Sequence, residues 1–409
     1  DEKQRQRHKE DLMKYIDEID IEGKKVLFRF DFNVPLDDKQ SVTDDTRITE
    51  ALPTIRYAVE RKARVIMMSH LGRPKGKRTP QFSLAPVAAR LSALLGQDVQ
   101  MAGDCVGPDV KALVDRMAPA ALVLLENLRF HPEEEANDDA FARELAGLAD
   151  VYIDDAFGNA HRAHASNAAI TKYVKACGAG FLIKKELNYL KNVLDHPARP
   201  FVAIIGGAKV SSKMDVLLNL LKKVDRMIIG GAMAFTFLKA QGHNVGKSLV
   251  EDDLQPKALE IMETAKKLGV TLLLPVDAMA AKDTQADAAH KVMPAAGMEN
   301  EWMGLDIGPE TVSLFSNAVK DAKTVVWNGP MGMFEIDAYS AGTTALAKNV
   351  AASGAVSVVG GGDTVTAVHK AAVADQITYI STGGGASLEL LEGKVLPAID
   401  ALENCGRNA

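Results

Sequence analysis

The sequence predicts an α/β protein with two doubly wound parallel-sheet (Rossmann-like) domains, joined by a helix and with a cleft between them. Ten short, continuous apolar runs are typical of strands that are buried on both faces. Segments with helical spacing of apolar residues lie between these runs, as in 87–96 and 138–149. The length of 409 residues is sufficient for two hydrophobic cores.

The predicted strands follow the chain in two groups. Those of the first half are 25–30, 64–69, 121–128 and 150–155. Those of the second half are 201–207, 226–231, 271–277, 324–330, 355–362 and 377–385. Because ten parallel strands divide naturally between two sheets, we expect one sheet in each half.

A connecting helix is predicted between the two halves. Leu187, Leu190 and Leu194 recur at helical spacing, and Pro197 and Pro200 then end the pattern. The expected division is an N-terminal domain over 1–183, a connecting helix and linker over 184–200, a C-terminal domain over 201–395, and a tail over 396–409.

The overall charge argues against nucleic acid or a membrane surface as a partner. The net charge is −6 and the sequence pI is about 5.9. Residues 51–100 nevertheless hold nine Lys or Arg against only Glu60 and Asp98. Most such cations lie on solvated helix faces, but Arg73, directly after an apolar strand, fits that interpretation less well.

The cysteines and the N-terminal segment predict a cytoplasmic protein. Cys105, Cys177 and Cys405 show neither C-x-x-C nor Cys/His ligand spacing, which argues against a disulfide framework or a zinc site. The first twenty residues are too charged for a signal peptide and predict an extension or a short exposed helix. No apolar run reaches 18 residues, so no membrane span is expected.

Glycine clusters end the strands of the second half. GGAK (206–209), GGGDT (360–364) and GGGAS (383–387) each precede a predicted helix, where bare backbone N–H groups can approach phosphate oxygens. The segment 244–248, NVGKS, has Gln241 where a Walker A loop requires glycine, and no G-x-G-x-x-G opens a helix. This disfavours an NAD-dependent dehydrogenase.

Motifs in both halves resemble, in the same order, those of the phosphoglycerate kinase family. They are RFDFNVPL (29–36), DDTRI (44–48), SHLGRPKG (69–76), LLENLRF (124–130), DAFGNAHRAHAS (155–166), GGAKVSSK (206–213), IIGGAMAFTFLKA (228–240), WNGPMGMFE (327–335), GGGDT (360–364) and STGGGASLELLEGK (381–394). The resemblance implies an enzyme of glycolysis and gluconeogenesis that transfers a phosphoryl group reversibly between 1,3-bisphosphoglycerate and ADP, giving 3-phosphoglycerate and ATP.

This chemistry explains the residue types. A carboxylate acceptor has a pKa of about 3.5 and is already a nucleophile at neutral pH, so no general base is required. Catalysis reduces to alignment and to neutralising charge on the transferring group. The alternative is a regulatory or scaffold protein that keeps the fold and binds nucleotide; loss of Arg47, Lys209 or Asp363 would favour it, and all three are present.

The resemblance places substrate binding in the first half. The cationic residues that it implies for the phosphate and acyl end are Arg47, His70, Arg73, Arg129 and Arg162, with Asp31 and Asn33 on the hydroxyl. Arginine suits phosphate because its planar fork donates two hydrogen bonds. Each cation alone would be read as a surface ion pair, but together at several strand ends they indicate a pocket.

His161 and His164 lie three positions apart, as metal ligands can, but no third ligand is visible nearby. We expect them to support Arg162.

The resemblance places the nucleotide in the second half. Arg47 and Lys209 would stabilise the transferring group, Lys213 would bind nucleotide phosphate, and Glu335 would hold the ribose. Asp363 would bind Mg²⁺ carried by ATP or ADP, although Asp after a strand is also a common helix N-cap. The other implied nucleotide-binding residues are Gly207, Gly230, Gly231, Gly304, Leu305, Asn328, Pro330, Gly361, Gly362 and Thr364.

Three further expectations complete the resemblance. The family commonly has Asn or Met where Asp154 stands, so a negative charge is predicted near the anion pocket, with an effect on substrate affinity. The tail from about Leu396 should return to the first domain. Closure of the two domains around both substrates is predicted for a protein that works as a monomer.

Overall fold

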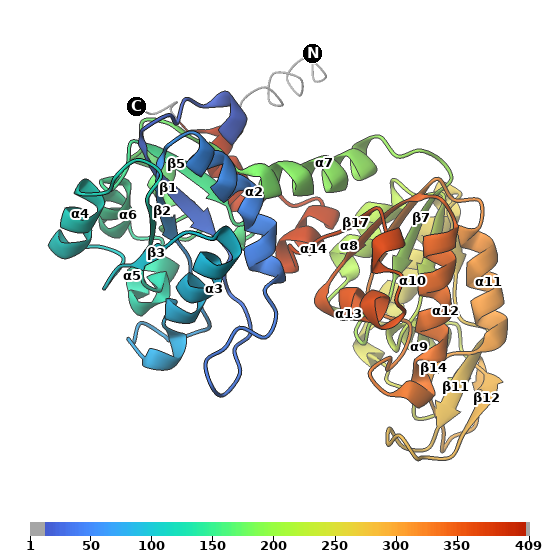
Figure 1. Ribbon diagram of the computed structural model, residues 1–409. Helices are drawn as coiled ribbons and strands as arrows, with labels where there is room; N and C mark the ends of the chain where they lie inside the picture. The colour runs from blue at the N-terminus through green and yellow to red at the C-terminus, as the bar shows by residue number, and fades with distance from the viewer. Residues whose placement is uncertain (1–12, 406–409) are drawn as a thin grey trace, which may run out of the picture. The chain divides into compact units, whose positions relative to one another are not determined.

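The computed structural model describes residues 13–405. Its contacts divide the chain into two compact units, which we call unit 1 (residues up to Leu187, and from Val395 onward) and unit 2 (Asn188–Lys394). Figure 1 shows the two units with their helices and strands. Most of the predicted N-terminal extension, residues 1–12, lies outside the described residues; the segment after it forms the 3₁₀ helix η1 (Ile16–Glu18), whose Ile16 is fully buried in the core of unit 1.

Unit 1 contains a six-stranded parallel sheet. Its strands are β1 (Lys25–Phe30), β2 (Arg64–Met68), β3 (Val99–Met101), β4 (Leu122–Leu124), β5 (Val151–Asp155) and β6 (Cys177–Ala179), in the order β3-β4-β2-β1-β5-β6. Every residue of β5 and all but the first of β1 are buried, so both faces of the sheet are covered. The predicted strands of this half are confirmed, whereas the three-residue strands β3 and β6 were missed.

Helices follow the strands of unit 1. They are α2 (Thr46–Glu60), α3 (Ala85–Leu95), α4 (Pro108–Asp115), α5 (Pro132–Glu135) and α6 (Asp139–Ala146), with 3₁₀ turns η2 (Pro80–Phe82), η3 (Leu128–Phe130), η4 (Phe157–Asn159) and η5 (Ala169–Lys172). Local sequence explains their ends. Gly96, in the left-handed region, ends α3, and Asp138 begins α6 by accepting a hydrogen bond from the N–H of Phe141.

Unit 2 contains a second six-stranded parallel sheet. Its strands are β7 (Phe201–Ile205), β8 (Arg226–Ile229), β10 (Thr271–Leu273), β15 (Thr324–Asn328), β16 (Val356–Gly360) and β17 (Tyr379–Ile380), in the order β10-β8-β7-β15-β16-β17. All six coincide with predicted strands. The two-domain α/β fold is therefore confirmed.

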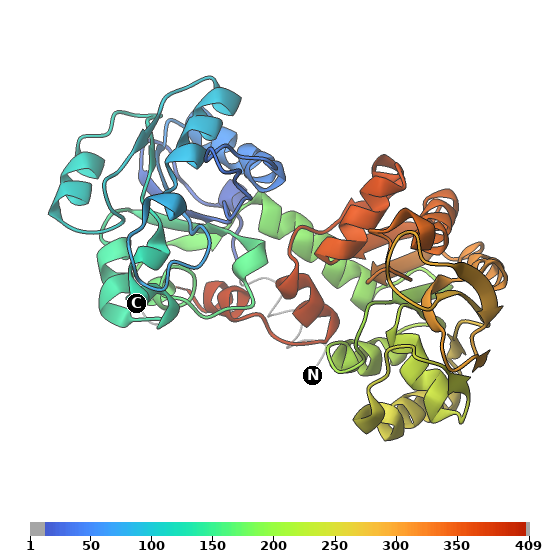
Figure 2. The ribbon, with the colours of Figure 1, turned by 90° about the horizontal axis from the view of Figure 1, so that it is seen from below.

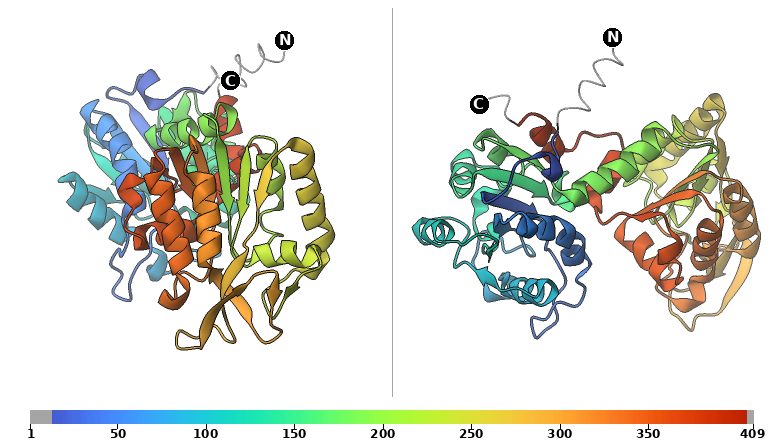
Figure 3. Two further views of the ribbon diagram at one scale, coloured as in Figure 1. Left: turned by 90° about the vertical axis from the view of Figure 1, so that its right-hand side faces the viewer. Right: turned by 45° about the horizontal axis from the view of Figure 1, so that its top comes forward.

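Two small sheets of unit 2 were not predicted. One joins β12 (His290–Pro294), β11 (Asp277–Ala281) and β14 (Met303–Ile307), and the other pairs β9 (Asn244–Val245) with β13 (Gly297–Met298). The β11–β12 hairpin lies below the main sheet in the left panel of Figure 3. Most of β12 is exposed, so it lacks the continuous apolar run of a buried strand.

The helices of unit 2 are α8 (Met214–Leu221), α9 (Met233–Ala240), α10 (Gln255–Leu268), α11 (Pro309–Val319), α12 (Ala341–Ala352), α13 (Gly362–Lys370) and α14 (Gly385–Leu391). Its 3₁₀ turns are η6 (Asp252–Leu254), η7 (Asp337–Tyr339) and η8 (Ala374–Gln376). The core around β7, β15 and β16 includes Trp327, which is fully buried and donates its ring N–H to the carbonyl of Gly329.

The chain passes between the units twice. Helix α7 (Phe181–Asp195) contains the first boundary, and its Leu187, Leu190 and Leu194 are buried. The second passage follows Lys394: α14 packs against α8 of unit 2, and α15 (Pro397–Glu403) belongs to unit 1, as the red segment of Figure 2 shows. The N–H of Ala398 donates to the carbonyl of Ala160.

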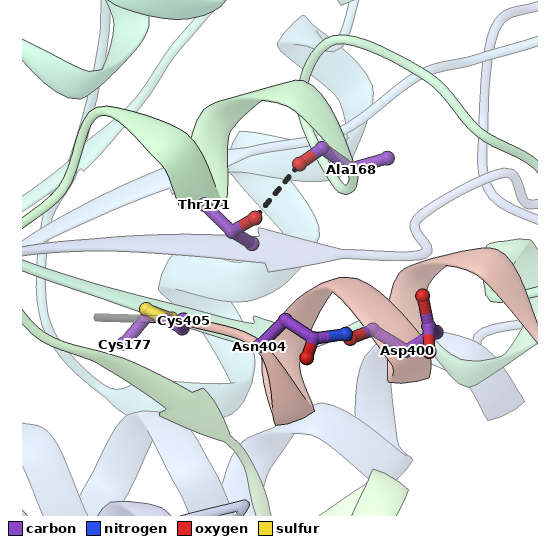
Figure 4. Close-up of a disulfide and its surroundings, with 6 residues drawn as sticks. All are labelled: Ala168, Thr171, Cys177, Asp400, Asn404 and Cys405. Carbon is purple, nitrogen blue, oxygen red and sulfur yellow. Dashed lines mark hydrogen bonds between the residues drawn. A yellow bond between two sulfur atoms is a disulfide. The ribbon is translucent and has the colours of Figure 1, made fainter. Parts of the chain in front are cut away.

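The cysteine prediction was wrong. The sulfur atoms of Cys177 on β6 and Cys405 after α15 are bonded, and their Cα atoms lie 6.3 Å apart (Figure 4). These residues are separated by 228 positions and meet only because α15 returns beside β6 and η5, so their spacing could not reveal the pair. Among residues 13–405, no helix has the length and apolarity to cross a membrane.

Candidate functional site

The carboxyl end of β1 leads into a polar cluster. Arg47, in the first turn of α2, donates from Nη1 to Asp31 Oδ2 at 2.9 Å and to the carbonyl of Asn33 at 3.2 Å. The side-chain oxygen of Asn33 accepts from the N–H of Gly72 at 2.8 Å. The predicted residues Asp31, Asn33 and Arg47 therefore lie together, next to the loop that follows β2.

The segment after β4 braces the same loop. Arg129 on η3 is 3% exposed and donates from Nη1 to the carbonyl of Gly72 at 2.9 Å. Its Nε lies 3.2 Å from Glu135 Oε1 in an ion pair. The Asn127 side chain donates to the carbonyl of Leu71 and accepts from the N–H of Arg129, which holds η3 against the loop.

His70 is buried among these cations. Burial lowers its pKa well below the ordinary value, and Arg29, Arg129, Arg162 and Arg47 lower it further. The imidazole is therefore neutral at pH 7. Its Nδ1 lies 3.3 Å from Arg29 Nη2, and since a guanidinium can only donate, Nδ1 accepts and the ring proton lies on Nε2.

A buried chain of polar groups supports this arrangement. Arg29, inside β1 and 1% exposed, donates from Nε to Ser166 Oγ at 2.9 Å and from Nη1 to the carbonyl of Phe30. Ser166 donates in turn from Oγ to Glu134 Oε1 at 2.6 Å and from its N–H to Oε2 at 2.9 Å. Burial opposes ionisation of Glu134, yet His164, Arg29 and Ser166 together hold its pKa below the ordinary value.

Two predicted cations lie at the margin. Arg162 is partly buried and donates from Nε to His161 Nε2 at 3.2 Å, as predicted for His161. His164 instead has its Nδ1 3.7 Å from Glu134 Oε1. Arg73 is exposed on the loop after β2, and its guanidinium makes no hydrogen bond to the described residues. It belongs to the same loop as His70 and Gly72 but extends into solvent.

Asp154, near the end of β5, is 1% exposed. One carboxyl oxygen accepts from the N–H of Ala156 at 2.9 Å, and the other has no hydrogen-bond partner within residues 13–405. Burial raises its pKa to about 6, although Ala156 and Arg29 oppose the shift. Asp154 therefore changes charge near neutral pH.

Unit 2 carries a cavity of about 730 Å³. Predicted nucleotide-binding residues in its lining are Gly207, Gly231, Gly304, Leu305, Pro330, Glu335 and Asp363. Those outside its lining are Lys213, Gly230, Asn328, Gly361, Gly362 and Thr364. Phe235, Leu249 and Ile336, which were not predicted, add an apolar wall suited to a planar heterocycle.

The glycines of this cavity allow close backbone approach. Gly231 has φ +68°, and a Cβ there would meet the backbone of Gly207 and the carbonyl of Pro330. A Cβ on Gly304 would strike the ring of Phe235. A side chain at Gly231 would therefore fill the space between the ends of β7, β8 and β15.

The two lysines predicted to act in unit 2, Lys213 and Lys209, differ in burial and in hydrogen bonding. Lys213 precedes α8 and donates from Nζ to the side chain of Asn328, which donates to the carbonyl of Gly360 at 3.0 Å. Burial lowers the pKa of Lys213, and Asp363 and Glu392 partly oppose this. The Lys209 ammonium is exposed and makes no hydrogen bond to the described residues.

The first turn of α13 presents Asp363. The N-cap is Gly361, so the N-cap interpretation of Asp363 was wrong, and its exposed carboxylate has no hydrogen-bond partner among the described residues. A carboxylate in this turn interacts favourably with the helix dipole. Thr364 is buried, and its hydroxyl accepts from the N–H of Gly329 at 2.6 Å.

Comparison with known proteins decides the family. The profile described as phosphoglycerate kinase matches residues 16–394. The chain belongs to the phosphoglycerate kinase family. The phosphoglycerate kinase of Desulfosudis oleivorans is 59% identical over 391 residues, covering 96% of this chain and 99% of that protein. The cytosolic phosphoglycerate kinase of Triticum aestivum is 54% identical over 389 residues, covering 94% and 97%.

Solved structures show the same relationship. The phosphoglycerate kinase of Coxiella burnetii has a TM-score of 0.89 and 44% identity, with 95% of this chain and 98% of that chain covered. The enzyme of Pyrococcus horikoshii OT3 has a TM-score of 0.81 and 29% identity, with 97% and 100% covered. The fold of this phosphoglycerate kinase family member is thus shared along nearly its whole length.

Sequence analysis did not identify several residues that hold the site side chains in place. Arg29 contacts His70 directly, and Glu134 supports Arg29 through Ser166. A single arginine in an apolar strand and a glutamate in an acidic run give no local signal. Glu251 accepts from the hydroxyl and the N–H of Ser211, and so braces the loop that carries Lys209. Ser211 lies in the recognised motif GGAKVSSK, but its partner is 40 positions away.

Proposed function

We propose that this protein transfers a phosphoryl group reversibly between 1,3-bisphosphoglycerate and ADP, giving 3-phosphoglycerate and ATP. As a phosphotransferase with a carboxyl acceptor, it acts in glycolysis and gluconeogenesis. The observation that carries the proposal is the cluster of arginines around the buried His70 at the strand ends of unit 1, in a chain that matches the family over residues 16–394. No observation favours a regulatory or scaffold role.

Unit 1 is proposed to bind the acid substrate. Arg129, Arg162 and Arg73 would hold the remote phosphate, and Asp31 and Asn33 would hold the hydroxyl. His70, neutral and protonated on Nε2, can donate a hydrogen bond without adding to the repulsion among the arginines.

Unit 2 is proposed to bind the nucleotide. The cavity, with its glycines and apolar wall, suits a base, and Glu335 in its lining suits the ribose hydroxyls. Lys213 would exchange its bond to Asn328 for a nucleotide phosphate. Gly361, Gly362, Asn328 and Thr364 would shape the phosphate end through the first turn of α13.

Asp363 is proposed to hold the Mg²⁺ of the nucleotide. Its exposed carboxylate, unpaired among the described residues, fits an ion that keeps several waters and takes its remaining ligands from phosphates. When bound, the ion would neutralise phosphate charge. The protein's own contribution is to place the nucleotide at the start of α13.

The transfer itself needs only alignment and positive charge. In the direction of ATP consumption, a carboxylate oxygen of 3-phosphoglycerate bonds to the γ-phosphorus of ATP as the bond from that phosphorus to the ADP oxygen breaks, and ADP leaves. Arg47 and Lys209 balance the charge of the transferring group. We propose that binding of both substrates brings the units together and excludes water that could otherwise accept the phosphoryl group. Small-angle X-ray scattering should show a smaller radius of gyration with both 3-phosphoglycerate and an ATP analogue bound; an unchanged radius would contradict closure.

A coupled assay tests the proposal. ATP consumption should require 3-phosphoglycerate as well as Mg²⁺, and no other phosphoryl acceptor should be needed. Turnover that ignores 3-phosphoglycerate, or its complete absence with correctly folded protein, would overturn the assignment. A cytoplasmic location is proposed, supported by the cytosolic wheat relative. The working form is proposed to be a monomer, and sedimentation would measure its mass.

A further inference from the structure

A second cluster of chemically active side chains lies in unit 1, among residues that have no part in the proposed reaction. Asp104 and Cys105 occupy the loop between β3 and α4, and His131 directly follows η3. A carboxylate oxygen, the thiol sulfur and an imidazole nitrogen from these residues all lie within 4.8 Å of one another. We propose that they bind one zinc-type divalent ion.

Local contacts hold the three side chains in place. His131 Nε2 lies 2.7 Å from Asp104 Oδ1, which also accepts from the N–H of Cys105 at 2.7 Å. The His131 ring stacks on Phe141, with ring centroids 5.2 Å apart. Neither a large loop movement nor a new backbone conformation is therefore needed to gather the ligands.

The burial pattern provides a closed side and an open side. Cys105 is fully buried, and it is the free cysteine of the described chain. Asp104 and His131 are partly exposed, with side-chain exposures of 39% and 28%. An ion can therefore enter between the carboxylate and the imidazole and reach the sulfur behind them.

The donor set selects the metal. Sulfur, imidazole nitrogen and carboxylate oxygen are all zinc ligands, and a soft thiolate disfavours Mg²⁺ and Ca²⁺. Three protein ligands leave a fourth tetrahedral position for water. Binding would release the thiol proton of Cys105 and any proton held between His131 and Asp104, because the ion takes up those lone pairs.

Sequence analysis argued against a zinc site because the cysteines lack C-x-x-C or Cys/His ligand spacing, and His131 lies 27 positions beyond Asp104. The fold removes this objection by placing η3 beside the loop after β3. A bound ion would tie that loop to the segment carrying Arg129, and so stabilise unit 1.

Arg78 offers a test of whether the bound ligand is positively charged. Its Nη1 lies 3.8 Å from Asp104 Oδ2, and its side chain is 58% exposed. A cation at the cluster would be repelled by this guanidinium, whereas a neutral ligand would not. Removing Arg78 should therefore strengthen metal binding.

The experiment is a titration of the untagged, nucleotide-free full chain with Co²⁺, followed by displacement with Zn²⁺. We expect one Co²⁺ per chain, with a thiolate-to-cobalt charge-transfer band and the intense visible bands of four-coordinate cobalt. Both should vanish when Zn²⁺ is added, and Zn²⁺ should raise the melting temperature.

Matched variants decide which residues bind. Cys105→Ser and His131→Ala should abolish the charge-transfer band, each with circular dichroism to show that the chain is folded. His243→Ala, at an exposed position outside the cluster, should retain it. Arg78→Ala should lower the dissociation constant roughly two- to fivefold, the scale of an exposed charge interaction.

Other results would contradict the proposed zinc site. No thiolate band in the unmodified protein, or a band that survives Cys105→Ser, would overturn the site. If Cys105→Ser does not fold, a band that survives His131→Ala would overturn it instead. Co²⁺ affinity that is unchanged in Asp104→Ala would remove Asp104 from the ligand set.

Discussion

The two units present charge in opposite ways. In unit 1 most of the arginines at the site are hydrogen-bonded within the protein: Arg29 to Ser166, Arg47 to Asp31, and Arg129 to the carbonyl of Gly72. Arg29 and Arg129 are also buried. In unit 2 the side chains of Lys209, Glu335 and Asp363 are exposed and make no hydrogen bond to the described residues. Apolar side chains and glycines, rather than hydrogen-bonded charged side chains, line most of the cavity there.

The difference indicates how each unit holds its charged side chains in position. Crowded arginines repel one another, so unit 1 needs a buried counter-charge, which Glu134 supplies. Unit 2 keeps its charged groups in water until a ligand engages them, so their removal should cost the fold little. Substitutions in unit 1 should therefore affect both stability and binding, whereas substitutions of the exposed side chains of unit 2 should affect nucleotide binding or catalysis with little loss of stability.

The largest effect is expected at Lys209. Lys209→Ala should lower kcat roughly 10²–10³-fold, the scale of losing one preorganised charge-stabilising donor. Because its ammonium has no partner among the described residues, the melting temperature should not change. Steady-state kinetics and circular dichroism measure the two quantities. Lys222→Ala, an exposed lysine after α8, is the control; a normal kcat for Lys209→Ala would remove Lys209 from catalysis.

Arg73 is the exception within unit 1, and it sharpens the comparison. Arg73→Ala should weaken 3-phosphoglycerate binding roughly ten- to hundredfold, as for one charge-assisted hydrogen bond, and leave ADP binding unchanged. Like Lys209 it is exposed, so stability should be preserved. Calorimetric titration of both ligands tests this, with Lys77→Ala in the same loop as control. Equal losses of affinity for the two ligands would contradict the assignment of 3-phosphoglycerate to unit 1 and of nucleotide to unit 2.

Glu134 tests whether the cations of unit 1 depend on a buried counter-charge. Glu134→Gln should lower the free energy of unfolding by about 1–3 kcal/mol, since a buried acceptor of two bonds from Ser166 is altered. Urea unfolding followed by circular dichroism measures this. Glu133→Gln makes the same change at the exposed neighbour and should have no effect. Equal stability of the two variants would show that the buried charge is dispensable.

Sequence reasoning succeeded where a feature is local. The runs that form β1, β7 and β15 are continuous and apolar, and all were found. β3, with the exposed Gln100 between Val99 and Met101, has too few buried residues to stand out.

The same limit applies to the sites. Asp31, Asn33 and Arg47 come from neighbouring motifs and do lie together. Arg29 is hydrogen-bonded to Ser166, 137 positions away, and Cys177 is bonded to Cys405. Neither contact could be predicted from the spacing of residues in the sequence. Contacts formed only by the tertiary fold leave no periodic pattern in the chain.

The smallest effect is expected at Asp154, and it depends on pH. Its pKa of about 6 lies above that of a free carboxyl, so the folded protein holds this proton more tightly than the unfolded chain does. The stability contribution is thus fully present below the unfolded pKa and is lost as pH rises to about 6 and beyond. Above this range the carboxylate is charged and opposes an anionic substrate; below it the group is neutral.

Asp154→Asn removes that switch while keeping the size of the side chain. At pH 5 the variant and the unmodified protein should have the same KM for 3-phosphoglycerate, whereas at pH 7.5 the variant's KM should be roughly two- to fivefold lower, as for removal of one nearby charge. Taking the ratio of the two proteins at each pH cancels the titration of the substrate's own phosphate. Asp98→Asn, an exposed carboxylate, should give a ratio near one throughout. A ratio for Asp154→Asn that is constant with pH would mean that the carboxyl does not change charge in this range, and that burial and the Ala156 hydrogen bond hold it in one state.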